Sequence, residues 1–152
     1  MKKLKKDNKG FSLVELLVVI AIMVVLVGVV APSLLSNIEK SRESKDVQNL
    51  DSIASALQSA ITDEDAHDDM PNNDGTPVAF STVFAKTGGA YTKNDDFYKK
   101  VREYLPSGES IKLSSKTAKT GEIYFKIKDD SITVYVSTDG AAPVSDKFSL
   151  TR

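Results

Sequence analysis

The stretch Gly10-Phe11-Ser12-Leu13-Val14-Glu15 opens an apolar run that continues from Leu16 to Ala31 without a charged or polar side chain. The ten residues before Phe11 carry five lysines and one aspartate. As a helix, the segment from Phe11 to Ala31 would span roughly 31 Å, about the thickness of the hydrocarbon core of a bilayer. Because the lysines precede it, the positive-inside rule keeps the N-terminus in the cytoplasm and exports the rest. The stretch therefore predicts a single-pass membrane helix with its N-terminus inside.

A cleaved secretory signal peptide and an ordinary uncleaved signal anchor are the alternatives for this run. A signal peptide needs small residues at its cleavage site. Val29-Val30-Ala31 fits that requirement poorly, and Pro32 directly after it would hinder cleavage. A lipoprotein signal is excluded because the chain contains no cysteine.

Glu15 is the only charged residue between Phe11 and Ala31. An ionised carboxylate deep in lipid costs about 2.5–3.5 kcal/mol on a lenient insertion scale, and near the edge the side chain can reach the interface. Glu15 is either a tolerated interfacial acid or a charge that is kept for a partner. We favour the partner, because an ionisable residue inside a membrane segment is by default a candidate functional residue.

The residues quoted so far resemble the start of the type IV pilin family. That pattern is a short basic leader ending in Gly, then Phe, three mostly apolar residues, Glu and an apolar helix. The chain matches it at Gly10, Phe11 and Glu15, and it has Pro32 after the helix. Close resemblance covers residues 1 to about 35, and the remainder agrees with the family only in architecture.

The resemblance implies that a prepilin peptidase cuts between Gly10 and Phe11, and that the new Phe11 amine is N-methylated. It also implies that Glu15 pairs with the N-terminal amine of a neighbouring subunit. The pKa of an α-amine is ordinarily about 7.7–8.0, so cleavage creates a cation in an apolar setting. A well-matched buried pair can persist and fix register where an unpaired charge is strongly unfavourable.

Further implications concern partners and location. The resemblance implies a homopolymer of pilin subunits, assembled by an inner platform with a cytoplasmic ATPase. The subunit would lie in the cytoplasmic membrane before assembly and in an extracellular pilus afterwards, serving adhesion, twitching motility or biofilm formation. The absence of cysteine is common in Gram-positive members, so the chain looks most like a clostridial major pilin. The alternative is a pseudopilin of a type II secretion or DNA-uptake system, because pseudopilins share the same N-terminal pattern.

Composition narrows the function classes. The 152-residue chain has a net charge of −1, and removing residues 1–10 with their five lysines and one aspartate leaves −5. We therefore expect no direct binding of nucleic acid by this subunit. Without cysteine there is no disulfide and no thiol catalysis, and His67 is the single histidine. We expect no enzymatic activity, no cofactor and no metal site, although calcium at the acidic residues 63–69 is a minor alternative.

The sequence predicts an α+β fold in which one long helix, from Phe11 to about Thr62, packs on an antiparallel sheet. We expect a cleaved leader (1–10), an apolar membrane or filament helix (11–35) and a head (36–152) that includes the amphipathic half of the helix (36–62). Gly28 and Pro32 mark the segment where the helix is expected to bend.

The polar tract Glu39–Asp46 is expected to be a solvated helix face, with weak ion pairs of Arg42 to Glu39 and to Asp46. After it, apolar residues recur at steps of three and four, which predicts a stripe that packs on the head and, as a minor alternative, a coiled-coil seam. The stripe consists of Val47, Leu50, Ile53, Ala54, Leu57 and Ile61.

The last two thirds of the chain predict shorter elements. The acids after Thr62 are expected to end the helix and to continue as a solvated loop. One helical turn is expected near Phe80–Phe84, stopped by Gly88-Gly89, and a second helix over 95–105, capped by Asn94 or Asp95. Strand patterns follow at Ile111–Leu113, Glu122–Lys128, Ser131–Ser137 and Phe148–Leu150, with a tight turn at Asp129-Asp130. They predict a sheet of three or four strands covered by the helix.

Overall fold

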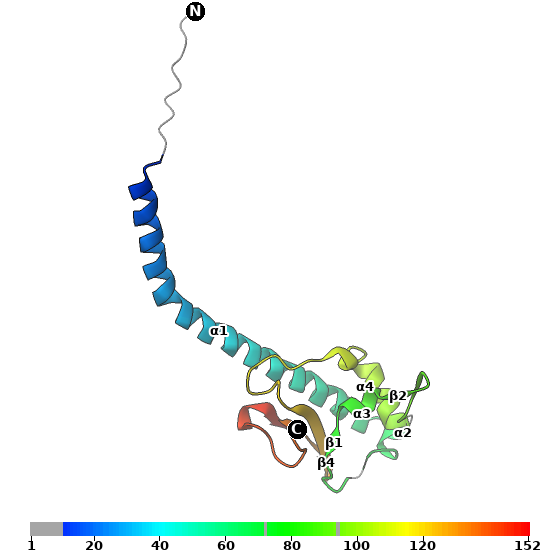
Figure 1. The fold of residues 1–152 in the computed structure, drawn as a ribbon. Coiled ribbons are helices and arrows are strands. Elements are labelled where there is room, and N and C mark those ends of the chain that lie inside the picture. Colours follow the sequence, from blue (N-terminus) through cyan, green and yellow to red (C-terminus); the bar gives the residue numbers. More distant parts are fainter. Residues whose placement is uncertain (1–10, 72, 94) are drawn as a thin grey trace, which may run out of the picture. The chain divides into compact units, whose positions relative to one another are not determined.

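The computed structural model describes residues 11–71, 73–93 and 95–152 (Figure 1). Gly10, the leader and the cap candidate Asn94 lie outside these residues. By its contacts the chain forms two units, which divide after Ile38, and we call Glu39–Arg152 the head. Helix α1 (Leu13–Ile61) is 49 residues long and belongs to both units. The prediction of one long helix is confirmed, whereas the three-part division with a boundary at residue 35 stays a prediction.

In the first unit, the helix has no neighbour among the described residues. Every side chain from Phe11 to Val30 is exposed, and the most apolar 18-residue window has a mean hydropathy of 3.2. By length and composition this helix can cross a membrane. The helix continues through Gly28 and Pro32, and a bend at these two positions stays a prediction, as does the orientation in the membrane.

In the head, the second half of α1 covers an antiparallel sheet, as predicted. The sheet has the order β1-β4-β5-β6, with β1 (Val78–Ala79), β4 (Glu122–Lys128), β5 (Ser131–Ser137) and β6 (Ser149–Thr151). The helix stripe and alternate residues of β4 and β5 form one buried core, because a helix face and a sheet face each need an apolar partner. The fully buried members include Leu50, Ile53, Leu57, Phe125, Ile132, Val134 and Val136.

The predicted tight turn between β4 and β5 is confirmed. Asp129 and Asp130 have φ angles of 51° and 60°, and positive φ at both central residues is typical of two-residue hairpin turns. The predicted strand at Ile111–Leu113 is wrong, because this segment has no regular secondary structure. The backbone N–H groups of Ser114 and Ser115, which follow it, donate hydrogen bonds to a carboxylate of α1 and not to a neighbouring strand.

The short helices agree with the predictions except after Thr62. There the acids do not lead directly into a loop, because Asp63 caps a further helix, α2 (Glu64–His67), by accepting a hydrogen bond from Ala66 N at 3.4 Å. The predicted turn and helix appear as α3 (Ser81–Phe84) and α4 (Asp96–Tyr104). Gly88-Gly89 does not end α3 itself; these glycines form the turn between β2 (Lys86–Thr87) and β3 (Ala90–Tyr91).

The tract Glu39–Asp46 is only partly the solvated face that we expected. Arg42 Nη1 lies 3.6 Å from Glu39 Oε2, as predicted. The predicted pair of Arg42 with Asp46 is wrong, since Asp46 is fully buried. Its carboxylate accepts hydrogen bonds from Ser114 N at 2.9 Å and Ser115 N at 2.8 Å. Asp46 thus fastens the segment before β4 to α1.

Candidate functional site

The side chain of Glu15 folds back over the N-terminal end of helix α1. Glu15 Oε2 accepts a hydrogen bond from Ser12 N at 2.9 Å, and Leu16 N donates to Ser12 O at 3.2 Å. A Ser followed three residues later by Glu is the spacing of a capping box, in which the Glu side chain returns to the backbone N–H of the cap residue. This role of Glu15 was not predicted, although the Ser12–Glu15 spacing is a signal that indicates it.

The same geometry leaves Glu15 able to bind a cation. Within the described residues, Oε1 accepts no hydrogen bond, and the side chain lies on the first turn, where the helix dipole favours negative charge. Phe11, which precedes Ser12, is 92% exposed. The structure therefore brings Phe11, Ser12 and Glu15 together at one helix end, while Gly10 lies outside the described residues.

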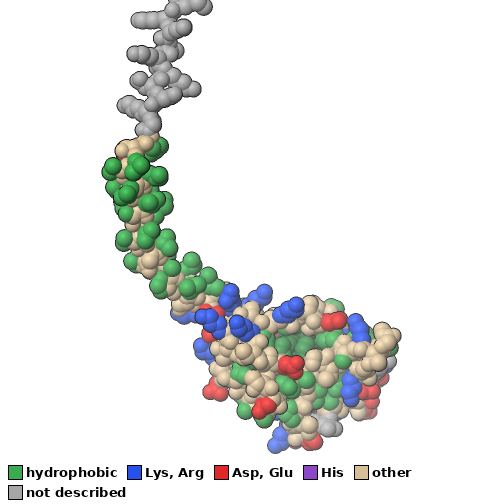
Figure 2. Space-filling model, viewed as in Figure 1, with side chains coloured by type: hydrophobic (Ala, Val, Ile, Leu, Met, Phe, Trp, Pro, Cys, Tyr) green, Lys and Arg blue, Asp and Glu red, His purple; other side chains and the backbone are tan. Residues whose placement is uncertain are grey.

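The residues from Leu16 to Val30 are apolar at every helix position but Gly28, and the face drawn in Figure 2 shows these side chains covering the helix. A helix that is hydrophobic all round is normally buried, either in a large core or in a membrane. Positions 11–30 are nevertheless all exposed. This surface can be satisfied by lipid or by other apolar helices, and both would exclude water from Glu15.

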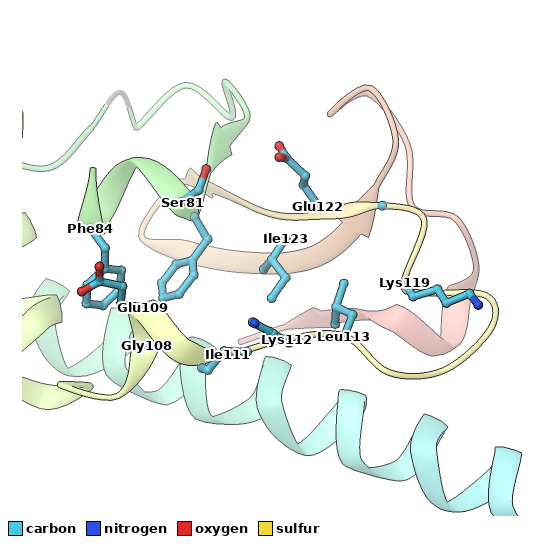
Figure 3. Close-up of a pocket in the computed structure, with 12 residues that line it drawn as sticks. Ser81, Phe84, Gly108, Glu109, Ile111, Lys112, Leu113, Lys119, Glu122 and Ile123 are labelled. Atoms are coloured by element: carbon cyan, nitrogen blue, oxygen red, sulfur yellow. The ribbon is translucent and has the colours of Figure 1, made fainter. Parts of the chain in front are cut away.

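The head contains a separate hollow of about 580 Å³ between α3, the 3₁₀ turn η1 (Gly108–Ser110) and the start of β4. Figure 3 shows Ile123 and Leu113 reaching toward one another across it, while Glu122 and Lys119 extend away. Glu109 on its rim pairs with Lys86 at 3.4 Å.

Two side chains of the acidic segment after α1 face oppositely charged or titratable groups elsewhere in the head. Lys100 Nζ lies 3.0 Å from Asp63 Oδ2, and this hydrogen-bonded cation lowers the pKa of Asp63. The His67 imidazole faces Asp130 at 3.6 Å. Among the described residues, no three His, Asp or Glu side chains are arranged to hold a metal ion.

Comparisons with known proteins converge on the N-terminal segment. Residues 5–31 match the family described as the prokaryotic N-terminal methylation motif. The chain is 31% identical over 68 residues, 45% of its length, to the type IV major pilin protein PilA of Myxococcus xanthus. It is 40% identical over 57 residues, 38% of its length, to the type II secretion system core protein G of Vibrio cholerae. The matched regions span 31% and 38% of those two relatives. No solved structure gives a significant match.

These findings identify the class of the N-terminal segment: a methylation motif leads into an apolar helix, and this start is similar to that of type IV pilin-like proteins. Its relatives include a major pilin and a secretion pseudopilin. The similarity of the N-terminal segment therefore leaves the particular role of the chain to be argued separately.

Proposed function

We propose that the chain is the precursor of a structural subunit, a major pilin, which polymerises into a surface fibre of the type IV pilus kind. In this proposal a prepilin peptidase removes residues 1–10, and the Phe11 amine is methylated. The subunit resides in the cytoplasmic membrane until an inner platform and its ATPase assemble it into the fibre. The proposal assigns no catalytic activity to the chain.

One observation carries the proposal: a methylation motif leads into a helical segment, residues 11–30, whose apolar side chains are all exposed. A surface of this size is not stable in water, so the helix needs lipid before assembly and other helices afterwards. Copies of the same helix are suitable occupants, because packing them side by side would bury the apolar surface of each. The proposal accounts for both environments with one segment.

Glu15 would set the position of each subunit in the fibre. Its carboxylate is held at the helix start by Ser12 N and has a second oxygen for a cation from outside. The Phe11 amine of a neighbouring subunit is a suitable cation. Leaving one member of such a buried pair without its partner costs about 3–5 kcal/mol, so misplaced subunits would be disfavoured.

The direct test is the intact mass and N-terminal residue of this protein in sheared surface filaments. The expected result is a chain that begins at methylated Phe11 and is the dominant filament component. A chain that begins at Met1, or directly after Ala31, would contradict the proposal.

Two substitutions of Glu15 separate its roles. Gln can still accept the hydrogen bond from Ser12 N, as in a capping box, but it carries no charge. We expect Glu15→Gln and Glu15→Ala to be cleaved normally and to assemble poorly, by about a hundredfold if roughly 3 kcal/mol is lost. Quantification of sheared filaments from cells that carry only the variant measures this. Normal filament yield with Glu15→Gln would show that Glu15 acts only as a helix cap.

A substitution at the cleavage site tests processing. We expect a bulky residue at Gly10 to leave the full-length precursor in the membrane, because the resemblance places the scissile bond directly after Gly10. Immunoblotting of membrane fractions distinguishes the two chain lengths. Processing at the normal rate would remove the peptidase from the proposal.

The second candidate is a pseudopilin of a type II secretion or DNA-uptake machine. The 40% identity with a secretion system core protein over 57 residues favours it. A processed chain that is found only in the membrane, and never as the main component of sheared fibres, would support the pseudopilin over the major pilin.

A further inference from the structure

Five exposed cations surround the first two turns of α1 in the head. Figure 2 shows blue side chains gathered where α1 enters the head. Three of them belong to α1 itself, one comes from the loop before β4, and one comes from the 3₁₀ turn η2 (Asp146–Phe148). We call them the basal cluster: Lys40, Arg42, Lys45, Lys116 and Lys147.

Carboxylates of α1 hold the segments that carry Lys116 and Lys147. Glu39 Oε1 accepts a hydrogen bond from Lys116 N, and Asp46 holds the two preceding amides, as described above. Lys147 Nζ lies 3.1 Å from Glu43 Oε2. These contacts hold the segments that carry Lys116 and Lys147 beside the helix, so the folded head itself determines where the cluster lies.

The cluster has a surplus of positive charge. Glu39 pairs with Arg42, Glu43 pairs with Lys147, and Asp46 is buried beneath the loop. Among the described residues, no carboxylate lies within 4.0 Å of the side-chain amine of Lys40, Lys45 or Lys116. These three lysines can therefore take an anion from outside.

Two members of the cluster, Lys40 and Lys147, border a hollow of about 640 Å³ that is also lined by Glu43, Ser44, Val47 and Gln48. Lys147 is paired with Glu43 there, so the Lys40 amine is the group in the hollow that suits a phosphate oxygen, and Val47 offers an apolar contact. The position of the cluster in the sequence, close to the apolar segment, also suits contact with lipid headgroups. Lys40 comes nine residues after Ala31, or about 13 Å along a helix, and a lysine side chain can reach back toward a headgroup.

We propose that the basal cluster binds the phosphate groups of anionic phospholipids and so holds the head to the membrane before assembly. This inference rests on the membrane stage of the proposed function. Basic residues beside a membrane segment attract anionic lipid, and each lysine near the surface strengthens binding by about fivefold. The attraction is screened by salt, because the Debye length is about 10 Å at 0.1 M.

The test uses the full chain in bilayers of phosphatidylcholine, with or without phosphatidylglycerol. Because the chain has no cysteine, Ser41→Cys provides a single site for a fluorophore beside the cluster, and Thr62→Cys provides a control site at the far end of α1. Lipids with a spin label on the headgroup quench the fluorophore. We expect quenching at position 41 to favour phosphatidylglycerol by about fivefold or more, and to lose this preference in high salt.

Matched triple variants locate the effect. Lys40, Lys45 and Lys116 are changed to Gln together, and the control changes Lys93, Lys99 and Lys128, which are also exposed and lie in segments away from the cluster. The basal variant should lose the preference, and the control should keep it. Equal losses in both variants, or no preference in the unchanged chain, would overturn the proposal.

Two other outcomes are distinguishable. Crosslinking from position 41 to a second copy, with no dependence on phosphatidylglycerol, would replace the lipid with a protein partner and overturn the proposal. A chain that fails to enter bilayers at all would contradict the membrane stage of the proposed function. Filament yield is not part of this test, so a failure of the lipid proposal leaves the fibre proposal standing.

Discussion

Asp46→Ala removes the acceptor of four hydrogen bonds that fasten residues 114 and 115 to helix α1. Asp46 is fully buried, and so is Ser115. Without the carboxylate, two backbone N–H groups lose their partner where water does not readily replace it. Unpaired buried donors cost about 1–3 kcal/mol each, and breaking a buried charged network costs about 3–5 kcal/mol. We therefore expect the head to lose about 3–5 kcal/mol of its free energy of unfolding.

Urea unfolding in detergent micelles measures this loss. The signal is the near-ultraviolet circular dichroism of the tyrosines, because the chain has no tryptophan. At a slope of about 1.5 kcal/mol/M, a loss of 3–5 kcal/mol lowers the midpoint by about 2–3 M urea. Trypsin gives a local readout, since release of the loop exposes the peptide bonds after Lys116 and Lys119, and both should be cut faster in the variant.

Asp51→Ala is the matched control on the same helix. Asp51 is exposed and pairs with Arg152 at the surface, and exposed pairs contribute about 0–1 kcal/mol. We expect its midpoint to stay near that of the unchanged chain. If Asp46→Ala and Asp51→Ala shift the midpoint equally, and trypsin cuts the loop at the same rate in both, the anchoring role of Asp46 is refuted.

Two further predictions concern the turn and the core of the head. Asp129→Val should lower the stability by about 1–2 kcal/mol, because a β-branched side chain is strained at positive φ, whereas Asp129→Asn should not; equal urea midpoints for both would contradict this. Burial raises the pKa of Tyr98, with a further contribution from Asp95, so the fold favours the neutral phenol. Stability should be complete below the unfolded pKa of about 10 and fall as the pH rises above it. Tyr98→Phe should lose less of its urea midpoint above pH 10, and Tyr104→Phe, at a 46% exposed position, is the control that should behave like the unchanged chain.

Periodicity predicted the elements that local pattern determines. Helix α1 and the hairpin of β4 and β5 each repeat apolar residues with the period of their structure, and the final strand β6 was indicated by Phe148 and Leu150, of which only Leu150 lies in it. Strand β1 was not predicted, because Val78–Ala79 is too short to show a period. Helix α2 was not predicted, because the acids that oppose the end of α1 also cap a new helix through Asp63.

The N-terminal site was predicted in its residues and only partly in its geometry. Phe11 and Glu15 were identified from their spacing, and the structure places both at the start of α1. The hydrogen bond from Ser12 N to Glu15 adds a role that concerns the monomer alone. Pairing with a second subunit depends on a partner chain, and no periodicity within one chain can reveal that contact.

The polar tract Glu39–Asp46 was predicted as a solvated face, but Asp46 is buried. The spacing of seven residues along α1 explains why. Glu39, Asp46, Ile53 and Ala60 are seven residues apart, so they lie on one face of α1. Ile53 and Ala60 are buried, and the same face continues backward to Asp46, which is fully buried, and to Glu39, which is partly buried. A carboxylate on a buried face requires hydrogen-bond donors, and its donors here lie 68 and 69 residues away, at Ser114 and Ser115. The face of Asp46 was therefore predictable from the helix, whereas its partner depends on the tertiary fold. The same two acids hold Lys116 beside the helix turns that carry Lys40 and Lys45, so the place of Lys116 in the basal cluster depends on the tertiary fold and could not be predicted from net charge.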